Sequence, residues 1–183
     1  MSEEMLIQHC SPTLAGMKTG NLFTCPYETE GELRQTLRFW NGALACKGVR
    51  ILPLRCHGGR ALIYLYRPAR LSRDLQNEAA RRLLRERGYR SEAPDQCVVL
   101  LGKRIRENGE FPHEIGLFLG YPPEDVSGFI ENRAERCKCV GCWKVYGDVE
   151  AAQKTFARYK KCTQVYRDQY ARGKSVERLT VAG

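Results

Sequence analysis

Two apolar runs separated by a pair of glycines place the strongest constraint on how this chain folds. The segment "VRILPLRCHGGRALIYLYRP" has runs rich in Ile, Leu, Val and Tyr on both sides of "CHGG". Glycine adopts the positive φ angles that a tight connection requires, so the sequence predicts a β-hairpin in which residues 49–55 pair with residues 61–67. Pro53 lacks the N–H group of a ladder donor, which places it at a sheet edge or a bulge.

Helical periodicity on both sides of this hairpin indicates a mixed fold. Apolar residues recur every three or four positions in residues 28–48, 72–87 and 94–107, and again in a long helix capped by Asp148. The sequence also predicts a short helix ending before Pro12, a strand over residues 21–25, short helices opening at Pro112 and at Pro122 or Pro123, and a strand in "WKVYGD". Because helices do not alternate regularly with strands, we expect an α+β fold with a small, mainly antiparallel sheet packed by several helices.

Composition points to one domain over residues 1–183. The chain has 183 residues, 43% of them apolar, and no linker rich in Pro, Gly or Ser. Its longest apolar runs, such as "CVVLLG", are far shorter than the roughly 20 residues that a membrane helix needs. The start "MSEEMLIQHC" has no basic region followed by a long apolar stretch, so we expect a cytoplasmic protein.

A cluster of cysteines is the first candidate site. Cys137, Cys139 and Cys142 have the spacing C-x-C-x-x-C, and the first candidate for a fourth ligand is Cys162, followed by Cys10, Cys56, His57 and His113. Thiolates bind zinc, iron and iron–sulfur clusters, so the cluster predicts such a centre, although it lacks the paired spacing of a zinc module and the run of a bacterial ferredoxin. Reactive thiols and simple apolar packing are the alternatives.

A cysteine-nucleophile enzyme is the second hypothesis. Cys10, or one of the clustered cysteines, would act as nucleophile, His113 as its base and Glu114 as the residue that orients the base. Nothing in the spacing brings these residues together. The alternative is that His113 hydrogen-bonds near a helix terminus and Glu114 complements the helix dipole.

Positive charge suggests binding of anions. In "SPTLAGMKTGNLF", small residues and two glycines surround Lys18, so this segment could approach an anionic cofactor closely, although it lacks P-loop spacing and could be a plain turn. The whole chain has a formal charge of +9, and residues 67–90 contain eight arginines. A third hypothesis is therefore a basic adaptor that binds an acidic protein or, with less support, a nucleic acid; the alternative is a solvated helix face.

Several segments together resemble a known bacterial family. These segments are "HCSPTLAGMKTGNLF", "LPLRC" with "ALIYLYRP", "FPHEIGLFLGYPPEDVSGFIEN", and "CWKVYGD" with "FARYKKC". They span nearly the whole chain and are similar to domain of unknown function 3793. The resemblance implies a protein of anaerobic bacteria, encoded near genes for ferrous-iron uptake and flavodoxin, and hence a role in iron handling or low-potential redox chemistry with a flavodoxin as a possible partner. It implies no catalytic residue, and it favours the metal or iron–sulfur hypothesis.

Overall fold

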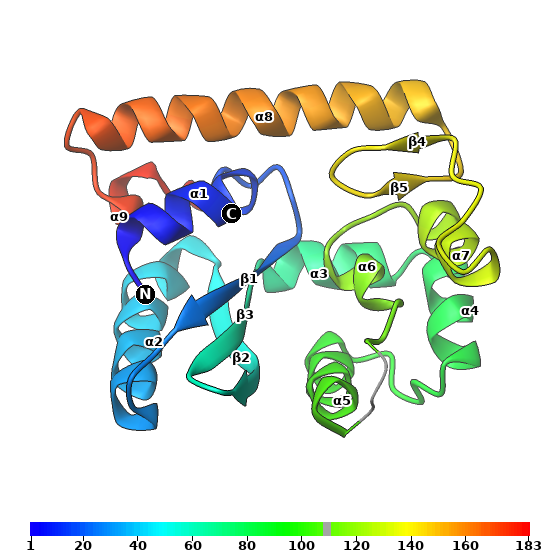
Figure 1. Cartoon of the computed structure of the whole chain (residues 1–183), viewed down its shortest axis with the longest axis horizontal. Helices are drawn as coiled ribbons and strands as arrows, with labels where there is room; N and C mark the ends of the chain where they lie inside the picture. The colour runs from blue at the N-terminus through cyan, green and yellow to red at the C-terminus, as the bar shows by residue number, and fades with distance from the viewer. Residues whose placement is uncertain (108–110) are drawn as a thin grey trace.

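The computed structural model describes residues 1–107 and 111–183 and has an α+β fold, as predicted. Antiparallel strands form its sheet, and helices pack on both faces (Figure 1). The strands are β1 (Gly20–Pro26), β2 (Arg50–His57), β3 (Arg60–Tyr66), β4 (Cys139–Val140) and β5 (Lys144–Val145). The helices are α1 (Glu3–Leu14), α2 (Glu30–Leu44), the 3-10 turn η1 (Ala45–Lys47), α3 (Pro68–Leu75), α4 (Glu78–Glu86), α5 (Pro94–Glu107), α6 (Ile115–Phe118), α7 (Pro123–Glu131), α8 (Val149–Ala171) and α9 (Val176–Leu179).

The larger sheet has the order β1-β3-β2 and is antiparallel throughout. It contains the predicted hairpin, in which β2 and β3 are joined through Gly58 and Gly59, both at positive φ. Pro53 lies on the edge strand β2, and the register shifts between Pro53 and Arg55. Both predicted settings for this proline are therefore confirmed.

The central strand β3 supplies side chains to two apolar cores because successive residues face opposite sides of the sheet. Ala61, Ile63 and Leu65 pack with α1 and α2. Tyr64 and Tyr66 stack on each other, with ring centroids 4.6 Å apart, and pack with α3, α5 and α6. The sheet is thus buried on both faces.

Helix α8 spans both ends of the molecule. Asp148 caps it as predicted, accepting a hydrogen bond from Ala151 N at 3.0 Å. Figure 1 shows α8 running along one side of the molecule, with α1 and α9 beside its C-terminal half and β4 and β5 beside its N-terminal half. The segment that links α1 to β1 passes between these two groups, so residues near 18 face the middle of α8.

Three predicted helix boundaries were wrong, and one strand was not predicted. Helix α1 continues past Pro12 to Leu14, because a proline in the last turn removes a single backbone bond and the surrounding residues are buried. The predicted helix 72–87 is two helices, because Asn77 caps a separate α4 by accepting from Ala79 N and Ala80 N.

Helix α6 begins at Ile115 rather than at Pro112, since residues 112–115 form a turn closed by the bond from Ile115 N to Pro112 O. In the cysteine segment, strand β4 was not predicted, and its pairing with β5 makes this segment a short hairpin. No helix in the described ranges combines the length and apolarity required to cross a bilayer.

Candidate functional site

A cavity of about 420 Å³ lies between α1, the start of β1, the β4–β5 hairpin and α8. Helix α1 contributes His9 and Pro12 to its wall, and Asn21 comes from β1. Tyr121 and Cys142 come from segments at least 100 residues further along the chain. The remaining lining side chains come from one face of α8, namely Phe156, Tyr159, Lys160, Thr163, Gln164 and Arg167.

Lys18 enters this cavity from a turn that ends α1. The N–H groups of Met17 and Lys18 both donate to Pro12 O, at 2.8 and 3.0 Å. Gly16 has a φ of 71°, the left-handed conformation that commonly ends a helix and that favours glycine. This pattern satisfies carbonyl groups at the end of α1 and fixes the backbone of Lys18.

The next residue of the turn is held from the opposite side. Arg67 N donates to Thr19 O at 2.9 Å, and the Thr19 hydroxyl is hydrogen-bonded to the Asp74 carboxylate. Gly120, at a φ of 76°, packs directly on Thr19, and a Cβ atom at Gly120 would lie 2.6 Å from Thr19 Oγ1. A glycine is therefore required at this contact, and the turn that carries Lys18 is rigidly placed.

Lys18 is a buried cation without a counter-charge. Its side chain is 6% exposed, and the structure gives it no carboxylate and no hydrogen-bond acceptor among the residues it describes. The ammonium lies 5.2 Å from the ring centroid of Tyr121. Burial lowers the pKa of Lys18 to about 8, while the nearby thiols of Cys10 and Cys142, when ionised, raise it.

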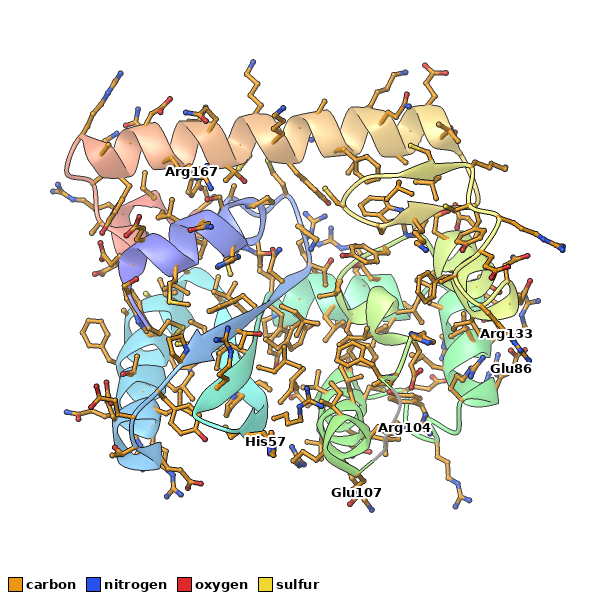
Figure 2. The ribbon with its side chains drawn as sticks, in the orientation of Figure 1. His57, Glu86, Arg104, Glu107, Arg133 and Arg167 are labelled. Carbon is orange, nitrogen blue, oxygen red and sulfur yellow. The ribbon has the colours of Figure 1, made fainter. Side chains whose placement is uncertain are left out.

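The rest of the described cavity wall adds positive charge and no negative charge. Lys160 and Arg167 are exposed on α8 at the cavity mouth, and no described lining residue is an Asp or a Glu. Figure 2 shows Arg167 on the side of α8 that is turned toward α1. The cavity thus presents three basic groups to a bound molecule, namely the amino groups of Lys18 and Lys160 and the guanidinium of Arg167.

An aromatic wall completes the site. The Tyr121 ring stacks on Trp143 with centroids 4.7 Å apart, and Trp143 meets Phe156 edge to face at 4.5 Å. Asp125 holds this wall in place, since its carboxylate accepts from Trp143 Nε1 at 2.6 Å and from two backbone N–H groups of the following segment. A flat ring could pack against these side chains.

The clustered cysteines do not converge on one point. Cys142 lines the cavity beside Lys18, and Cys139 Sγ lies 4.0 Å from Gln153 Nε2. Cys137 lies near Tyr146, whose pKa is raised by burial and further by the Cys137 thiolate. Cys162 packs against the core that contains α1 and α2. Within residues 1–107 and 111–183, no three His, Cys, Asp or Glu side chains are grouped as a metal site requires.

The reason for this separation is local. Cys139 belongs to β4 and Cys142 to the turn before β5, so strand pairing sets their directions independently. Figure 2 also places His57, one of the alternative ligands, at the far end of β2, away from α8. The arrangement gives no support to a centre held by Cys137, Cys139, Cys142 and Cys162, and metal binding stays a prediction.

The predicted Cys10, His113 and Glu114 site is not assembled either. Cys10 is fully buried in the core beside α2, and burial raises the pKa of its thiol far above the ordinary value. His113 is exposed, with its ring 5.0 Å from that of Phe129. Glu114 is engaged elsewhere, since it pairs with Arg104 at 3.0 Å and accepts from Tyr89 at 3.2 Å. These contacts favour structural roles for Cys10 and Glu114.

The local sequence pattern predicted Lys18 as a binding residue, but it did not predict the residues that surround it. Phe156, Tyr159 and Thr163 share one apolar helical face, a pattern that indicates core packing, yet part of that face lines the cavity. The tryptophan within the cysteine cluster was the available signal for an aromatic wall at this hairpin.

Comparisons with known proteins address the whole chain rather than this cavity. No curated protein and no solved structure matches it. Residues 6–180 match the family described as protein of unknown function (DUF3793). The match covers nearly the full length and agrees with the resemblance seen in the sequence, so the chain belongs to the DUF3793 family.

Proposed function

We propose that this protein binds a small anionic molecule with a flat apolar body in the cavity around Lys18. The single observation that carries this proposal is that Lys18, a residue only 6% exposed, presents an unpaired ammonium to a cavity whose described wall contains no carboxylate. A bound anion would supply the missing counter-charge. This function develops the prediction that Lys18 contacts a cofactor.

The energetic cost of Lys18 supports a binding role. Lowering its pKa from 10.5 to about 8 corresponds to about 3 kcal/mol of unfavourable free energy for the charged form. Buried charges in proteins are normally paired, because an isolated charge in an apolar setting is costly. A side chain with this cost is understandable if the charge is neutralised when a ligand binds.

The shape of the site supports a small ligand. A volume of about 420 Å³ falls in the range of typical small-molecule sites. Lys18, at 6% exposed, is out of reach for the surface of a protein or for a nucleic-acid backbone. The Tyr121 ring, which is supported from behind by Trp143, would contact a planar group, while Lys160 and Arg167 at the mouth would attract the anion.

Tryptophan fluorescence offers a direct test with simple probes. Of the two tryptophans, Trp143 packs against Tyr121 and Phe156 of the cavity wall and Trp40 lies on α2 in the core, so a Trp40→Phe chain reports on the surroundings of the site. We would titrate it with 4-methylbenzenesulfonate, which has a ring and a permanent charge, with sulfate, and with 4-methylbenzyl alcohol. The sulfonate should bind about tenfold more tightly than sulfate or 4-methylbenzyl alcohol, because it alone has both the charge and the ring.

Matched variants of two lysines locate the binding. Lys18→Met keeps most of the unbranched side chain and removes its charge, so affinity for the sulfonate should fall about 10- to 100-fold, as expected for a charge-assisted contact. Lys161→Met, an exposed position on α8 outside the cavity, should leave affinity unchanged. Equal affinity for all three probes, or equal losses in the two variants, would refute the proposed function.

A further inference from the structure

The amine of Lys18 stands in the cavity beside an aromatic ring, with cationic groups at the mouth to hold the far end of a ligand. We propose that Lys18 is a nucleophile that forms an imine with the aldehyde or ketone group of an anionic aromatic ligand. This inference rests on the proposed function and specifies its ligand class. Lys18 would be a catalytic or covalent binding residue, since it contacts the reacting carbon.

The surroundings of Lys18 suit a nucleophilic amine. An amine attacks only in its neutral form, and an exposed lysine with a pKa near 10.5 is about 0.1% neutral at pH 7.5. Burial lowers the pKa of Lys18 to about 8, so about a quarter of the population would be neutral at the same pH. No carboxylate among the described lining residues holds the amine in its charged form.

The placement of charge in the cavity also favours one orientation. Lys160 and Arg167 are exposed residues of α8 that line the cavity, whereas Lys18 is buried. A carbonyl ligand whose anionic group pairs with Lys160 and Arg167, rather than with Lys18 as for a simple anion, would therefore direct its opposite, carbonyl end toward Lys18. The Tyr121 ring, 5.2 Å from the ammonium, would support the ring of that ligand.

The reaction balances without any redox partner. The lone pair of Lys18 Nζ forms a bond to the carbonyl carbon, and the electron pair of the broken π bond passes to the carbonyl oxygen. That oxygen takes up a proton from the attacking nitrogen, which gives a carbinolamine. Loss of the hydroxyl group with one more proton leaves an imine and one water molecule, so one amine and one carbonyl compound give one imine and one water.

The test uses 4-formylbenzenesulfonate, the aldehyde counterpart of the sulfonate probe. The full-length protein is incubated with it near pH 7.5, sodium borohydride reduces any imine to a stable amine, and peptide mass spectrometry identifies the labelled lysines. We expect Lys18 to be labelled at least tenfold faster than exposed Lys161. An excess of unreactive 4-methylbenzenesulfonate should protect Lys18 and leave Lys161 unaffected.

The dependence on pH distinguishes Lys18 from surface lysines. Its labelling rate should rise through about pH 8 and then level off, whereas that of Lys161 should keep rising toward pH 10. The titratable and charged groups that face Lys18 in this range are His9 and Cys10 of α1, Tyr121, Cys142 of the hairpin, and Tyr159, Lys160 and Arg167 of α8.

Two readouts on the unmodified chain, sulfonate binding and selective labelling, separate the two proposals. Lys18→Arg has no amine that forms an imine, so it should lose the selective label. If the sulfonate binds to the unmodified chain and Lys18 is labelled no faster than Lys161, the imine proposal is refuted while the proposed function stands. If the sulfonate fails to bind and does not protect Lys18 from labelling, both the proposed function and the imine proposal are refuted. Binding and protection are measured on the natural chain, so neither result depends on whether a variant folds.

Discussion

Two buried cations lie next to each other in this molecule and differ in what surrounds them. Arg67 is 3% exposed and Lys18 is 6% exposed, and the two are linked through the backbone bond from Arg67 N to Thr19 O. The guanidinium of Arg67 donates to four carbonyl groups, whereas the ammonium of Lys18 has no acceptor in the described ranges. The two side chains are therefore similarly buried, but Arg67 has hydrogen-bond acceptors and Lys18 has none in the described ranges.

The partners of Arg67 explain why its charge is compatible with the core. Its nitrogens donate to the carbonyl oxygens of Thr13 at 2.6 Å, Leu14 at 2.7 Å, Val181 at 2.7 Å and Lys47 at 3.1 Å. One side chain thus ties together the end of α1, the turn after α2 and the segment after α9. A planar guanidinium with five N–H groups suits this task, and a lysine would not.

The contrast indicates two different uses of buried charge. Arg67 has a complete set of acceptors within the chain, so its role is structural. Lys18 borders a cavity with an aromatic wall and further cations, so its acceptor would come from outside the chain. The two roles therefore differ in their expected effects on stability, binding and reactivity.

Replacing Arg67 should strongly destabilise the fold. Arg67→Met would leave buried carbonyl groups without donors, and we expect a loss of about 4 kcal/mol in the free energy of unfolding. Urea denaturation measures this loss in the free energy of unfolding. Arg73→Met, at an exposed position of α3, is the control and should change stability by less than about 0.5 kcal/mol. Similar small losses in both variants would contradict a structural role for Arg67.

Replacing Lys18 should stabilise the fold, which is the opposite of the effect expected for Arg67. The folded-state pKa of about 8 lies below the ordinary value of 10.5, so folding is penalised in full below pH 8 and the penalty disappears as pH rises to about 10.5. Lys18→Met should therefore be more stable than the natural chain by about 3 kcal/mol at pH 7, with the difference vanishing near pH 10.5. Denaturation curves at several pH values measure this difference. A variant less stable at pH 7 would mean that Lys18 is satisfied within the fold.

Binding of 4-methylbenzenesulfonate should weaken as Lys18 loses its proton. The sulfonate keeps its charge at all pH values used, so the decline through about pH 8 reports on the protein and should reach about tenfold by pH 9.5. Titrations followed by Trp143 fluorescence at several pH values measure this decline in affinity. Lys18→Arg retains its charge and should show a much flatter profile, and identical profiles for the two chains would assign the decline to another group.

The two thiols beside Lys18 should differ in reactivity. Cys10 is sealed in the core with its thiol pKa raised by burial, whereas Cys142 is exposed and borders the cavity. Iodoacetamide should label Cys142 and leave Cys10 unmodified in the folded protein. Burial raises the pKa of Cys142 and Lys18 lowers it, so Lys18→Met should slow the labelling of Cys142 several-fold but leave that of exposed Cys46 unchanged. Rapid labelling of Cys10 would overturn the assigned burial.

Metal removal should have the smallest effect. Because Cys137, Cys139, Cys142 and Cys162 lie in different surroundings, protein purified without oxygen should contain well under one equivalent of zinc or iron per chain. A chelator should leave its melting temperature unchanged. One tightly bound equivalent, lost in a Cys139→Ser variant, would instead establish the metal site expected from the sequence.

Local patterns predicted the elements whose determinants are local. The glycine pair and flanking apolar runs gave the β2–β3 hairpin, and Asp148 marked the start of α8. The three-and-four spacing located α5 at residues 94–107. It failed between α3 and α4, where the cap formed by Asn77 overrides a periodicity that continues across the break.

The candidate site could be predicted only in part. Lys18 drew attention because glycines and small residues surround it, and this is a property of the local sequence. Its cavity is completed by Tyr121, Cys142 and residues of α8, which lie more than 100 positions away along the chain. Conversely, the close spacing of three cysteines predicted convergence, whereas the pairing of β4 with β5 separates them.

By itself, the sequence determined the α+β class, the antiparallel hairpin, the principal helices and the excess of positive charge, because each depends on neighbouring residues or on composition. The tertiary structure alone decided which cations are satisfied. Arg67 meets four carbonyl groups from distant segments and Lys18 meets a cavity, and burial and hydrogen bonding of this kind depend on which segments pack together in space.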